Sequence, residues 1–586
     1  MSNNNQMGQV VAGQASQYIS IVPENGEQFV AGQKIIYNIE PEVGYIKKDS
    51  YLLFDVLNTS AQLNRVSFPH GVGAHALIDN VNIYSKETGV LLESLQNYGE
   101  WRIVEHQYLN DSLDQKALKE GVGKSAQSYL YNQGEDFPRS VINSAHEIEN
   151  NVLSPVSTNL SAKYASTRFC IPLKTGLMGH FDNDPKLIPI LNFGGLRIEI
   201  QLATNRLALQ HLGARYNRTA YTAAQGAGNS RQEHVVPIGN DEGNNVGVGL
   251  RLGIDDGTQA NNQGVFAAGA NVFIRNPDNH GTNWKSLADC GLAVGNVVKL
   301  YKANTLEGTD RTFVADGGGG AASTRTVTAI AFVGGNTTIN GHTGPDTIQV
   351  TLDGNLTGFT NGANDAHYLI VSSGTVSYKI TKTEYRLLQI QPPPEMMNQM
   401  AQGINYEFTS YETFLDNIPT ASMRHQIPVH SVASKALALF SSVYDSNLVD
   451  NINHQQYYYG LPPESSLVNN VVYFINNRLY PLRSYNPQAK EDKVLTLNEL
   501  NKALQAIGKS PLSLGSADFG DLNGYSNKFL FSRELARQGF VFDLRNAEPE
   551  VRLQFSGVRN SVLRVNTFVF SKRIVQTSAQ GVQVIY

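Results

Sequence analysis

Two Gly-Lys-Ser triplets are the part of this sequence with the clearest potential for chemistry, and they stand at residues 123–125 and 508–510. A phosphate-binding loop has the form G-x-x-x-x-G-K-[ST], and its first glycine matters because backbone amides must wrap around the phosphate. That first position holds Leu118 in one copy and Ala503 in the other. Neither triplet therefore predicts a nucleotide site.

The surroundings of the triplets favour a structural interpretation. Each one ends a helical pattern, whereas a phosphate loop follows a strand and precedes a helix. Gly121 and Gly508 are expected to adopt the left-handed conformation that ends helices, with Lys124 and Lys509 close to the carbonyl end of the helix dipole.

Two pairs of aspartates are the next candidates for chemistry. "FDNDPK" places Asp182 near Asp184, and "GIDDG" joins Asp255 to Asp256. Calcium loops need several spaced oxygen ligands, and neither stretch continues into such a series. We interpret these aspartates as turn residues.

Histidine and cysteine do not form a recognisable ligand set. His70 and His75 are near each other in "PHGVGAH", without a third ligand, and Cys170 and Cys290 form no CxxC pair. Zinc sites generally take three or four protein ligands. No local signature of a catalytic serine or cysteine appears. We therefore predict no enzymatic activity, no catalytic residues, no metal site and no cofactor.

A run of three tyrosines, Tyr457, Tyr458 and Tyr459, lies in "HQQYYYGLPPE". Such a cluster can stack on sugars or bases, or it can pack between subunits, where tyrosine supplies both area and a hydroxyl. We favour the subunit interface.

Composition excludes further classes of function. The chain has 586 residues with 41% hydrophobic residues, 17% charged residues and a net charge of −5. Nucleic-acid binding needs clustered Lys and Arg, so we expect no sequence-specific nucleic-acid binding. The apolar runs are far shorter than the ~20 residues of a membrane span, and the N-terminus has no secretory signal pattern. A surface rich in amides and poor in charge suits tight packing against copies of the same chain.

Alternating apolar residues predict β-strands over most of the chain. Before residue 208 they include "KIIYNIE", "SYLLFDVLN", the hairpin "DNVNIYSKETGVLLESL" and "GGLRIEIQLA"; after residue 404 they include "NYEFTSYETFL", "ALALFSSVYD" and "VLRVNTFVFSKRIV". Helical spacing appears at 94–120 and in "LTLNELNKALQAIG".

The segment 208–372 differs from the rest, because it holds 26 of the 52 glycines. Short strand patterns within it predict a small, loop-rich β subdomain inserted in a loop of the parent domain. The resulting division is a flexible N-terminal arm at 1–17, a first β domain at 18–207 plus 373–391, the insertion, a proline-bounded linker helix at 392–403 and a second β domain at 404–586. Each β domain has the size of a sandwich of about eight strands.

Several segments, taken in order, resemble the double jelly-roll major capsid proteins of virophages and polinton-like viruses, in the adenovirus-type lineage. They are "IDNVNIYSKETGVLLESL" running into "YGEWRIVEHQYL", then "IPLKTGLMG" and "LIPILNFGGLRIEIQLA", the proline-bounded linker, and "NVVYFINNRLYPLRSY". The resemblance implies an all-β fold of two consecutive eight-stranded jelly-roll sandwiches, with a large loop insertion in the first and a few short helices.

The resemblance also implies a function. Three chains would form a pseudo-hexagonal homotrimer that tiles an icosahedral viral shell around double-stranded DNA. Its partners would be neighbouring capsomers, a penton protein at the vertices and minor capsid proteins. The insertion would form a tower on the outside, and the arm would lie inside the shell or at the base of the capsomer, where it would connect neighbouring capsomers. The protein would be made in the host cytoplasm or nucleus and reside in the virion.

The alternative is a viral spike or a carbohydrate-binding β protein. The tyrosine run and the glycine-rich insertion favour this alternative. Absence of glycan binding and of sugar cleavage would exclude the alternative, whereas glycan binding confined to residues 208–372 would be compatible with both interpretations.

Overall fold

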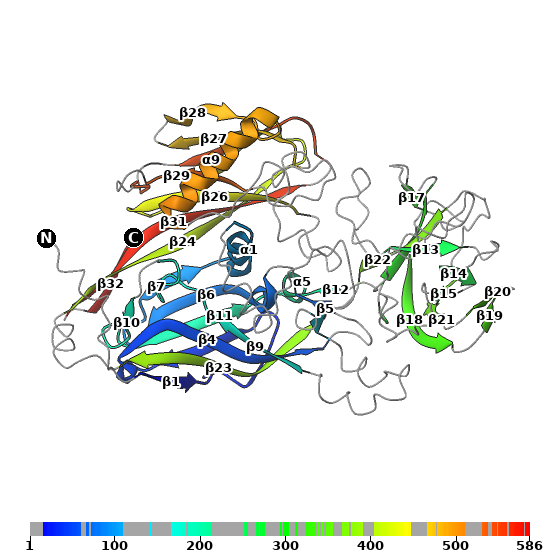
Figure 1. The fold of residues 1–586 in the computed structure, drawn as a ribbon, viewed down its shortest axis with the longest axis horizontal. Coiled ribbons are helices and arrows are strands. Elements are labelled where there is room, and N and C mark those ends of the chain that lie inside the picture. The colour runs from blue at the N-terminus through cyan, green and yellow to red at the C-terminus, as the bar shows by residue number, and fades with distance from the viewer. Residues whose placement is uncertain are drawn as a thin grey trace.

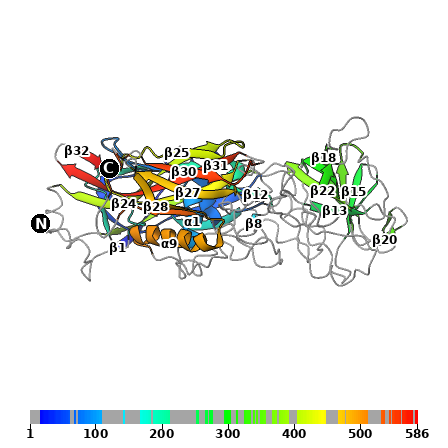
Figure 2. The same ribbon diagram turned by 90° about the horizontal axis from the view of Figure 1, so that it is seen from above.

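The computed structural model shows an elongated, mostly β molecule whose glycine-rich insertion lies at one end (Figures 1 and 2). The structure describes residues 16–59, 66–68, 72–108, 141–142, 166–182, 186–211, 251–255, 265–268, 270–275, 294–295, 297–303, 311–313, 324–333, 337–339, 342–344, 347–355, 366–373, 377–390, 403–446, 466–475, 478–509, 530–536, 542–545, 547, 549–559, 562–578 and 581–586.

The first sandwich consists of two sheets. Sheet A has the order β1-β23-β4-β10, with β2 paired to β23 and β9 paired to β4, and sheet B has the order β3-β11-β6-β7. The strands are β1 (Ser16–Ile21), β2 (Gln28–Val30), β3 (Lys34–Ile39), β4 (Tyr45–Asn58), β6 (Ile78–Ser85), β7 (Leu91–Leu95), β9 (Ser166–Pro172), β10 (Leu187–Pro189), β11 (Leu196–Leu202) and β23 (Tyr378–Ile390).

The second sandwich consists of sheets C and D. Sheet C has the order β24-β31-β26-β29, with β32 paired to β31, and sheet D has the order β25-β30-β27-β28. The strands are β24 (Asn405–Ile418), β25 (Arg424–Pro428), β26 (Ala436–Asp445), β27 (Val468–Ile475), β28 (Arg478–Tyr485), β29 (Phe531–Glu534), β30 (Glu550–Phe555), β31 (Leu563–Ser578) and β32 (Gly581–Ile585).

The two sandwiches share one strand order. We number the strand positions 1 to 8 in chain order within each sandwich. In the first sandwich β1 and β2 share position 1, and β9 and β10 share position 6. Sheets A and C then both have the order 1-8-3-6, and sheets B and D both have the order 2-7-4-5. The predicted all-β fold of two eight-position sandwiches is confirmed. The halves show no evident sequence repeat, so the duplication becomes visible in the structure.

Alternation explains why the strands form where they do. In β3 and β11 every second residue is buried, as expected for a strand with one face in a core. The β6–β7 hairpin turns at Gly89, whose φ of 70° suits glycine and whose amide donates to the carbonyl of Ser85. The predicted hairpin is therefore present.

Sheet C is buried on both of its faces. Every side chain from Leu437 to Val443 on β26 and from Val565 to Ser571 on β31 is buried. A strand with one solvent face alternates, whereas a strand covered on both sides is continuously buried. Sheet C is consequently the inner layer of the molecule, with sheet D on one side and the first sandwich on the other.

Helix α1 (Tyr98–Tyr108) begins later than the predicted start at residue 94. Leu95 still belongs to β7, and Asn97 separates strand from helix with a φ of 52°. Asparagine tolerates this left-handed conformation better than most residues. Residues 109–120, the rest of the predicted helical interval, lie outside the described residues.

Helix α9 (Lys490–Ala506) ends as its sequence predicted. Gly508 has a φ of 72°, its amide donates to the carbonyl of Gln505, and the amide of Lys509 donates to the carbonyl of Leu504. This is the Schellman arrangement, in which the amides after a helix cap its last carbonyls. The backbone amides that a phosphate would need are thus already used. The first triplet, at 123–125, lies outside the described residues.

The insertion contains an eight-stranded sheet, and seven of its strands close into a ring. The order is β17-β16-β18-β21-β15-β14-β13-β22, and β22 also pairs with β16, so that β17 alone lies outside the ring. Closure removes the exposed edges of the other seven strands. The strands are β13 (Arg251–Asp255), β14 (Val265–Ala268), β15 (Asn271–Arg275), β16 (Val297–Ala303), β17 (Arg311–Phe313), β18 (Thr324–Val333), β21 (Thr347–Leu352) and β22 (Ala366–Ser373).

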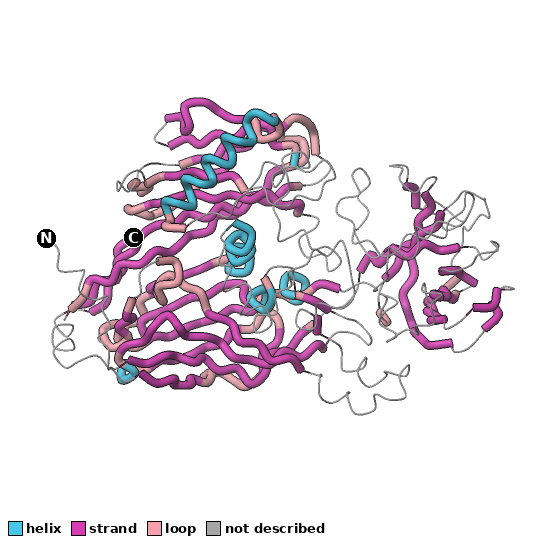
Figure 3. Tube along the Cα trace, viewed as in Figure 1, coloured by secondary structure: helices cyan, strands magenta, loops and turns pink. Residues whose placement is uncertain are grey.

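Smaller elements complete the described chain. Two strands, β19 (Thr337–Ile339) and β20 (His342–Gly344), form a hairpin, and a three-stranded sheet has the order β12-β5-β8. The remaining bounds are η2 (Pro41–Val43), β5 (Val66–Ser67), η3 (Gly73–Leu77), β8 (Val141–Ile142), α5 (Asn205–Ala208) and β12 (Gln210–His211). Figure 3 shows how few helices accompany the strands.

The predicted N-terminal arm differs from the structure at its end. Ser16 and Gln17 were expected to close a flexible arm, but they belong to β1 and pair with Ile390 and Gln389 of β23. Backbone pairing with a long neighbouring strand outweighs their polar character. Residues 1–15 and most of the linker helix expected at 392–403 lie outside the described residues.

Candidate functional site

Among the described residues, the two sandwiches contact each other through buried side chains of α1, the β9–β10 loop and sheet C. We call this contact region the joint. Trp101 of α1 inserts among four rings of sheet C, at centroid distances of 5.8 Å to Tyr411, 5.5 Å to Phe440, 5.3 Å to Phe568 and 4.5 Å to Phe570. All five rings are buried. Tilted contacts at such distances stabilise beyond area burial alone. Helix α1 thereby covers the face of sheet C that points away from sheet D.

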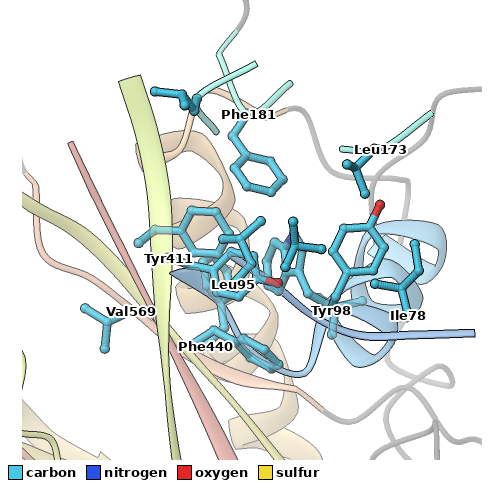
Figure 4. Packing of buried hydrophobic residues seen from close by; sticks show 14 of the residues in the cluster. Ile78, Leu95, Tyr98, Leu173, Phe181, Tyr411, Phe440 and Val569 are labelled. Atoms are coloured by element: carbon cyan, nitrogen blue, oxygen red, sulfur yellow. The ribbon is translucent and has the colours of Figure 1, made fainter. Parts of the chain in front are cut away.

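The loop between β9 and β10 adds a second aromatic contact. Phe181 of this loop lies 5.8 Å from both Tyr411 and Phe570. Phe193, in the next connection between β10 and β11, lies 5.6 Å from Tyr406. Figure 4 shows Phe181, Tyr411 and Phe440 converging, with Val569 on the other side of the sheet C strands. The joint is therefore a continuous apolar core that joins segments far apart in the sequence.

A buried carboxylate lies beside this core. Glu93 of β7 accepts hydrogen bonds from the amides of Gly176 and Leu177, each at 2.9 Å, and from the hydroxyl of Ser410 on β24 at 2.5 Å. Burial raises the pKa of Glu93, while these hydrogen bonds and the charge of Arg573 oppose the rise. The carboxylate ties β7, the β9–β10 loop and the second sandwich together.

A second buried carboxylate joins α1 to β31. Glu100 is 4% exposed and accepts hydrogen bonds from Asn566 and, at 3.3 Å, from the guanidinium of Arg564. Removing one partner of a buried ion pair is strongly destabilising. Glu100 therefore fixes the position of α1 on sheet C.

The edge of β24 is capped by the β9–β10 loop. Lys186 donates to the carbonyl of Glu407 at 2.7 Å and to Asp182 at 2.8 Å, and Asp182 accepts from the hydroxyl of Thr409 at 2.8 Å. Gly176 lies so close that a Cβ there would be 2.0 Å from the carbonyl oxygen of Thr409. An open strand edge invites pairing with other chains, and this loop covers part of it within the chain.

The same loop contains a histidine held in its neutral form. The Nε2 of His180 lies 3.0 Å from the carbonyl of Lys48, to which it donates, and Nδ1 then accepts from the amide of Thr175 at 3.3 Å. Burial lowers the pKa of His180 to about 3, and the nearby charges of Lys174 and Arg102 act in the same direction.

Acid is therefore expected to weaken the joint. The unfolded chain protonates His180 near its ordinary pKa of 6.5, whereas the folded chain does so only near 3. Stability is thus lost as the pH falls below about 6.5, by up to about 2 kcal/mol at about pH 5. The raised pKa of Glu93 acts oppositely, since the folded protein then gains protons first on acidification.

A His180→Gln variant isolates this contribution, because glutamine can keep both hydrogen bonds without titrating. The free energy of unfolding is measured by urea unfolding between about pH 6.5 and pH 5 for both proteins. As the pH falls, the wild type should lose more stability than the variant. A difference that stays constant with pH would contradict the assignment.

The structure gives other roles to several residues considered for chemistry. Asp182 is a joint residue, as described above, and His75 is buried beside the hydroxyl of Tyr98, 3.2 Å from its Nδ1. No cluster of three potential metal ligands occurs among the described residues. Likewise, no helix in the described part of the chain is long and apolar enough to cross a membrane. His70, Asp184, Asp256 and Cys290 lie outside the described residues.

Tyr457, Tyr458 and Tyr459 also lie outside the described residues, so their place at a subunit interface stays a prediction. The residues that do form the joint carry only weak signals in the sequence. Glu93 is a lone carboxylate in the apolar strand "LLESL", and the unbroken apolar runs of β26 and β31 indicate a sheet covered on both faces.

Comparisons with known proteins agree with this architecture. No family model matches the sequence, and no curated protein matches it. Among solved structures, the Faustovirus major capsid protein superimposes with a TM-score of 0.50 and 8% identity, over 99% of this chain and 93% of that chain. The chain has the double jelly-roll fold.

Other solved double jelly-roll proteins match over similar lengths. VP54 of PBCV-1, fitted into a reconstruction of the virophage Sputnik, has 9% identity and a TM-score of 0.46 over 99% of this chain and 98% of that chain. The mavirus major capsid protein has 10% identity and a TM-score of 0.33 over 97% and 90%. At such identities the likeness concerns the fold.

Proposed function

We propose that this chain is a viral major capsid protein whose work is assembly rather than catalysis. The observation that supports the proposal most is the pair of sandwiches with one strand order, held by a buried joint, in the fold of the Faustovirus major capsid protein. Because each chain holds two like sandwiches side by side, three chains can present six similar sides.

In this proposal three copies form a pseudo-hexagonal tile with six sandwiches. The tiles surround double-stranded DNA in an icosahedral shell, with a separate penton protein at its vertices and minor capsid proteins between capsomers. The protein is made in the host cell and resides in the virion. The closed sheet of the insertion forms a tower on the outside, because it projects from one end of the double sandwich (Figure 2).

The mass of the purified protein tests the proposal. Light scattering should give about three times the 64.2 kDa chain mass, or a larger shell. A stable monomer over the whole accessible concentration range would contradict it.

A further inference from the structure

Both sandwiches carry a helix at the same point of the shared strand order. Helix α1 follows β7, the fifth position of the first sandwich, and α9 follows β28, the fifth position of the second. Helix α1 covers the outer face of sheet C through Trp101. Helix α9 packs on β29 and β26 of its own sandwich, and its opposite side has no corresponding sheet within the described chain.

The exposed side of α9 is apolar near the start of the helix and carries the amides Asn498 and Gln505 farther along. The buried side of α9 includes Leu500, Ala503 and Leu504, which face their own sandwich. On the other side, Val494 is 62% exposed and Leu495 is 43% exposed. Adjacent exposed aliphatic residues on a helix cost solvation free energy unless a partner covers them.

Sheet A occupies the position in the first sandwich that sheet C occupies in the second. Its inner face carries Leu52, Phe54 and Val56, so Leu53 and Leu57 of β4 belong to the outer face, where both are half-buried. Figure 1 shows this sheet on the side of the molecule away from the joint.

Aromatic and basic side chains surround these leucines. Tyr18 and Tyr51 contact each other at 5.9 Å. Arg168 and Lys382 extend above the sheet, 50% and 72% exposed, and both pair with Asp55. Tyrosine, arginine and aliphatic residues together are the composition typical of protein interfaces.

We propose that the exposed side of α9 docks on the outer face of sheet A of a second copy of this chain, as α1 docks on sheet C within one chain. The inference rests on the proposed capsid function and names the contact that would build the tile. Such a contact is heterologous, because a helix meets a sheet, and heterologous contacts close into rings when the rotation allows. Joints within and between chains then alternate around the tile.

Two variants test this contact from its two sides. Val494→Asp combined with Leu495→Asp changes the helix surface, and Leu53→Lys changes the sheet surface, where lysine can extend its charge to solvent. Each change affects an exposed or half-buried position, so both proteins should unfold in urea like the wild type. Analytical ultracentrifugation should show each variant as a monomer of 64.2 kDa. Val558→Asp, at a 67% exposed loop position, is the matched control and should keep the wild-type mass.

A mixture of the two variants gives the sharper result. Each retains the surface that the other lacks, so one intact contact can form, and a head-to-tail arrangement predicts a one-to-one dimer that cannot close into a ring. The contact is refuted if either variant alone keeps the wild-type assembly, or if the mixture stays monomeric. A monomeric wild type would instead refute the proposed function itself.

Discussion

Replacing Trp101 by alanine should lower the free energy of unfolding by about 3–5 kcal/mol, the range typical of large aromatic residues removed from a core. The indole lies within 6 Å of four rings of the other sandwich. Its Nε1 has no hydrogen-bond partner among the described residues, so the loss is one of packing. Because these contacts cross the joint, the two sandwiches should also unfold less cooperatively.

Urea unfolding followed by circular dichroism measures both effects. Trp101→Phe should retain much of the stability, since a ring still fills part of the site. Val22→Ala is the control, because Val22 is 68% exposed and its truncation should cost less than about 1 kcal/mol. Equal effects of Trp101→Ala and Val22→Ala would show that the joint is not the core described above.

Replacing Gly176 by alanine should have the second largest effect, about 2–4 kcal/mol. The added Cβ would lie 2.0 Å from the carbonyl oxygen of Thr409 and 2.7 Å from Oε1 of Glu93. The loop must then withdraw from β24, and the amides of Gly176 and Leu177 lose their hydrogen bonds to Glu93. Each buried polar group left without a partner costs about 1–3 kcal/mol.

Gly557→Ala is the matched control for this variant. A Cβ at Gly557 would meet its nearest neighbour, a methyl carbon of Leu467, at an ordinary contact distance of 3.7 Å. Its effect on thermal unfolding should be small, within about 0.5 kcal/mol. If Gly176→Ala were equally mild, the close approach of the loop to β24 would be wrong.

The strands of both sandwiches could be predicted from the sequence because their information is local. Alternation in "KIIYNIE" and "GGLRIEIQLA" identifies a buried face without any knowledge of the partner sheet. Glycines at turns and helix ends, such as Gly89 and Gly508, were predictable for the same reason, since a positive φ is a property of one residue.

The joint could not be predicted in this way, because its contacts are distant in sequence. Glu93 and Ser410 are 317 positions apart, and helical spacing marks Trp101 as apolar without naming the rings that surround it. Asp182 shows the same limit. Its neighbours in the sequence suggested a turn or an ion, whereas its hydroxyl partner, Thr409, lies in the other sandwich.

The repeated architecture was also hidden from sequence inspection. Sheets A and C have the same order but contain different residues, since β-sandwich cores tolerate many apolar substitutions that keep volume and pattern. The equivalence of α1 and α9 follows from topology, and the proposed contact between copies depends on it.

Negative-stain images of the purified full-length chain test the central claim most directly. The claim is that three chains, each with two sandwiches held together by the joint, make one tile. Hexagonal particles of three chains, with three projections on one face, are the expected result. Elongated single-chain particles at every concentration, with no hexagonal outline, would contradict the account.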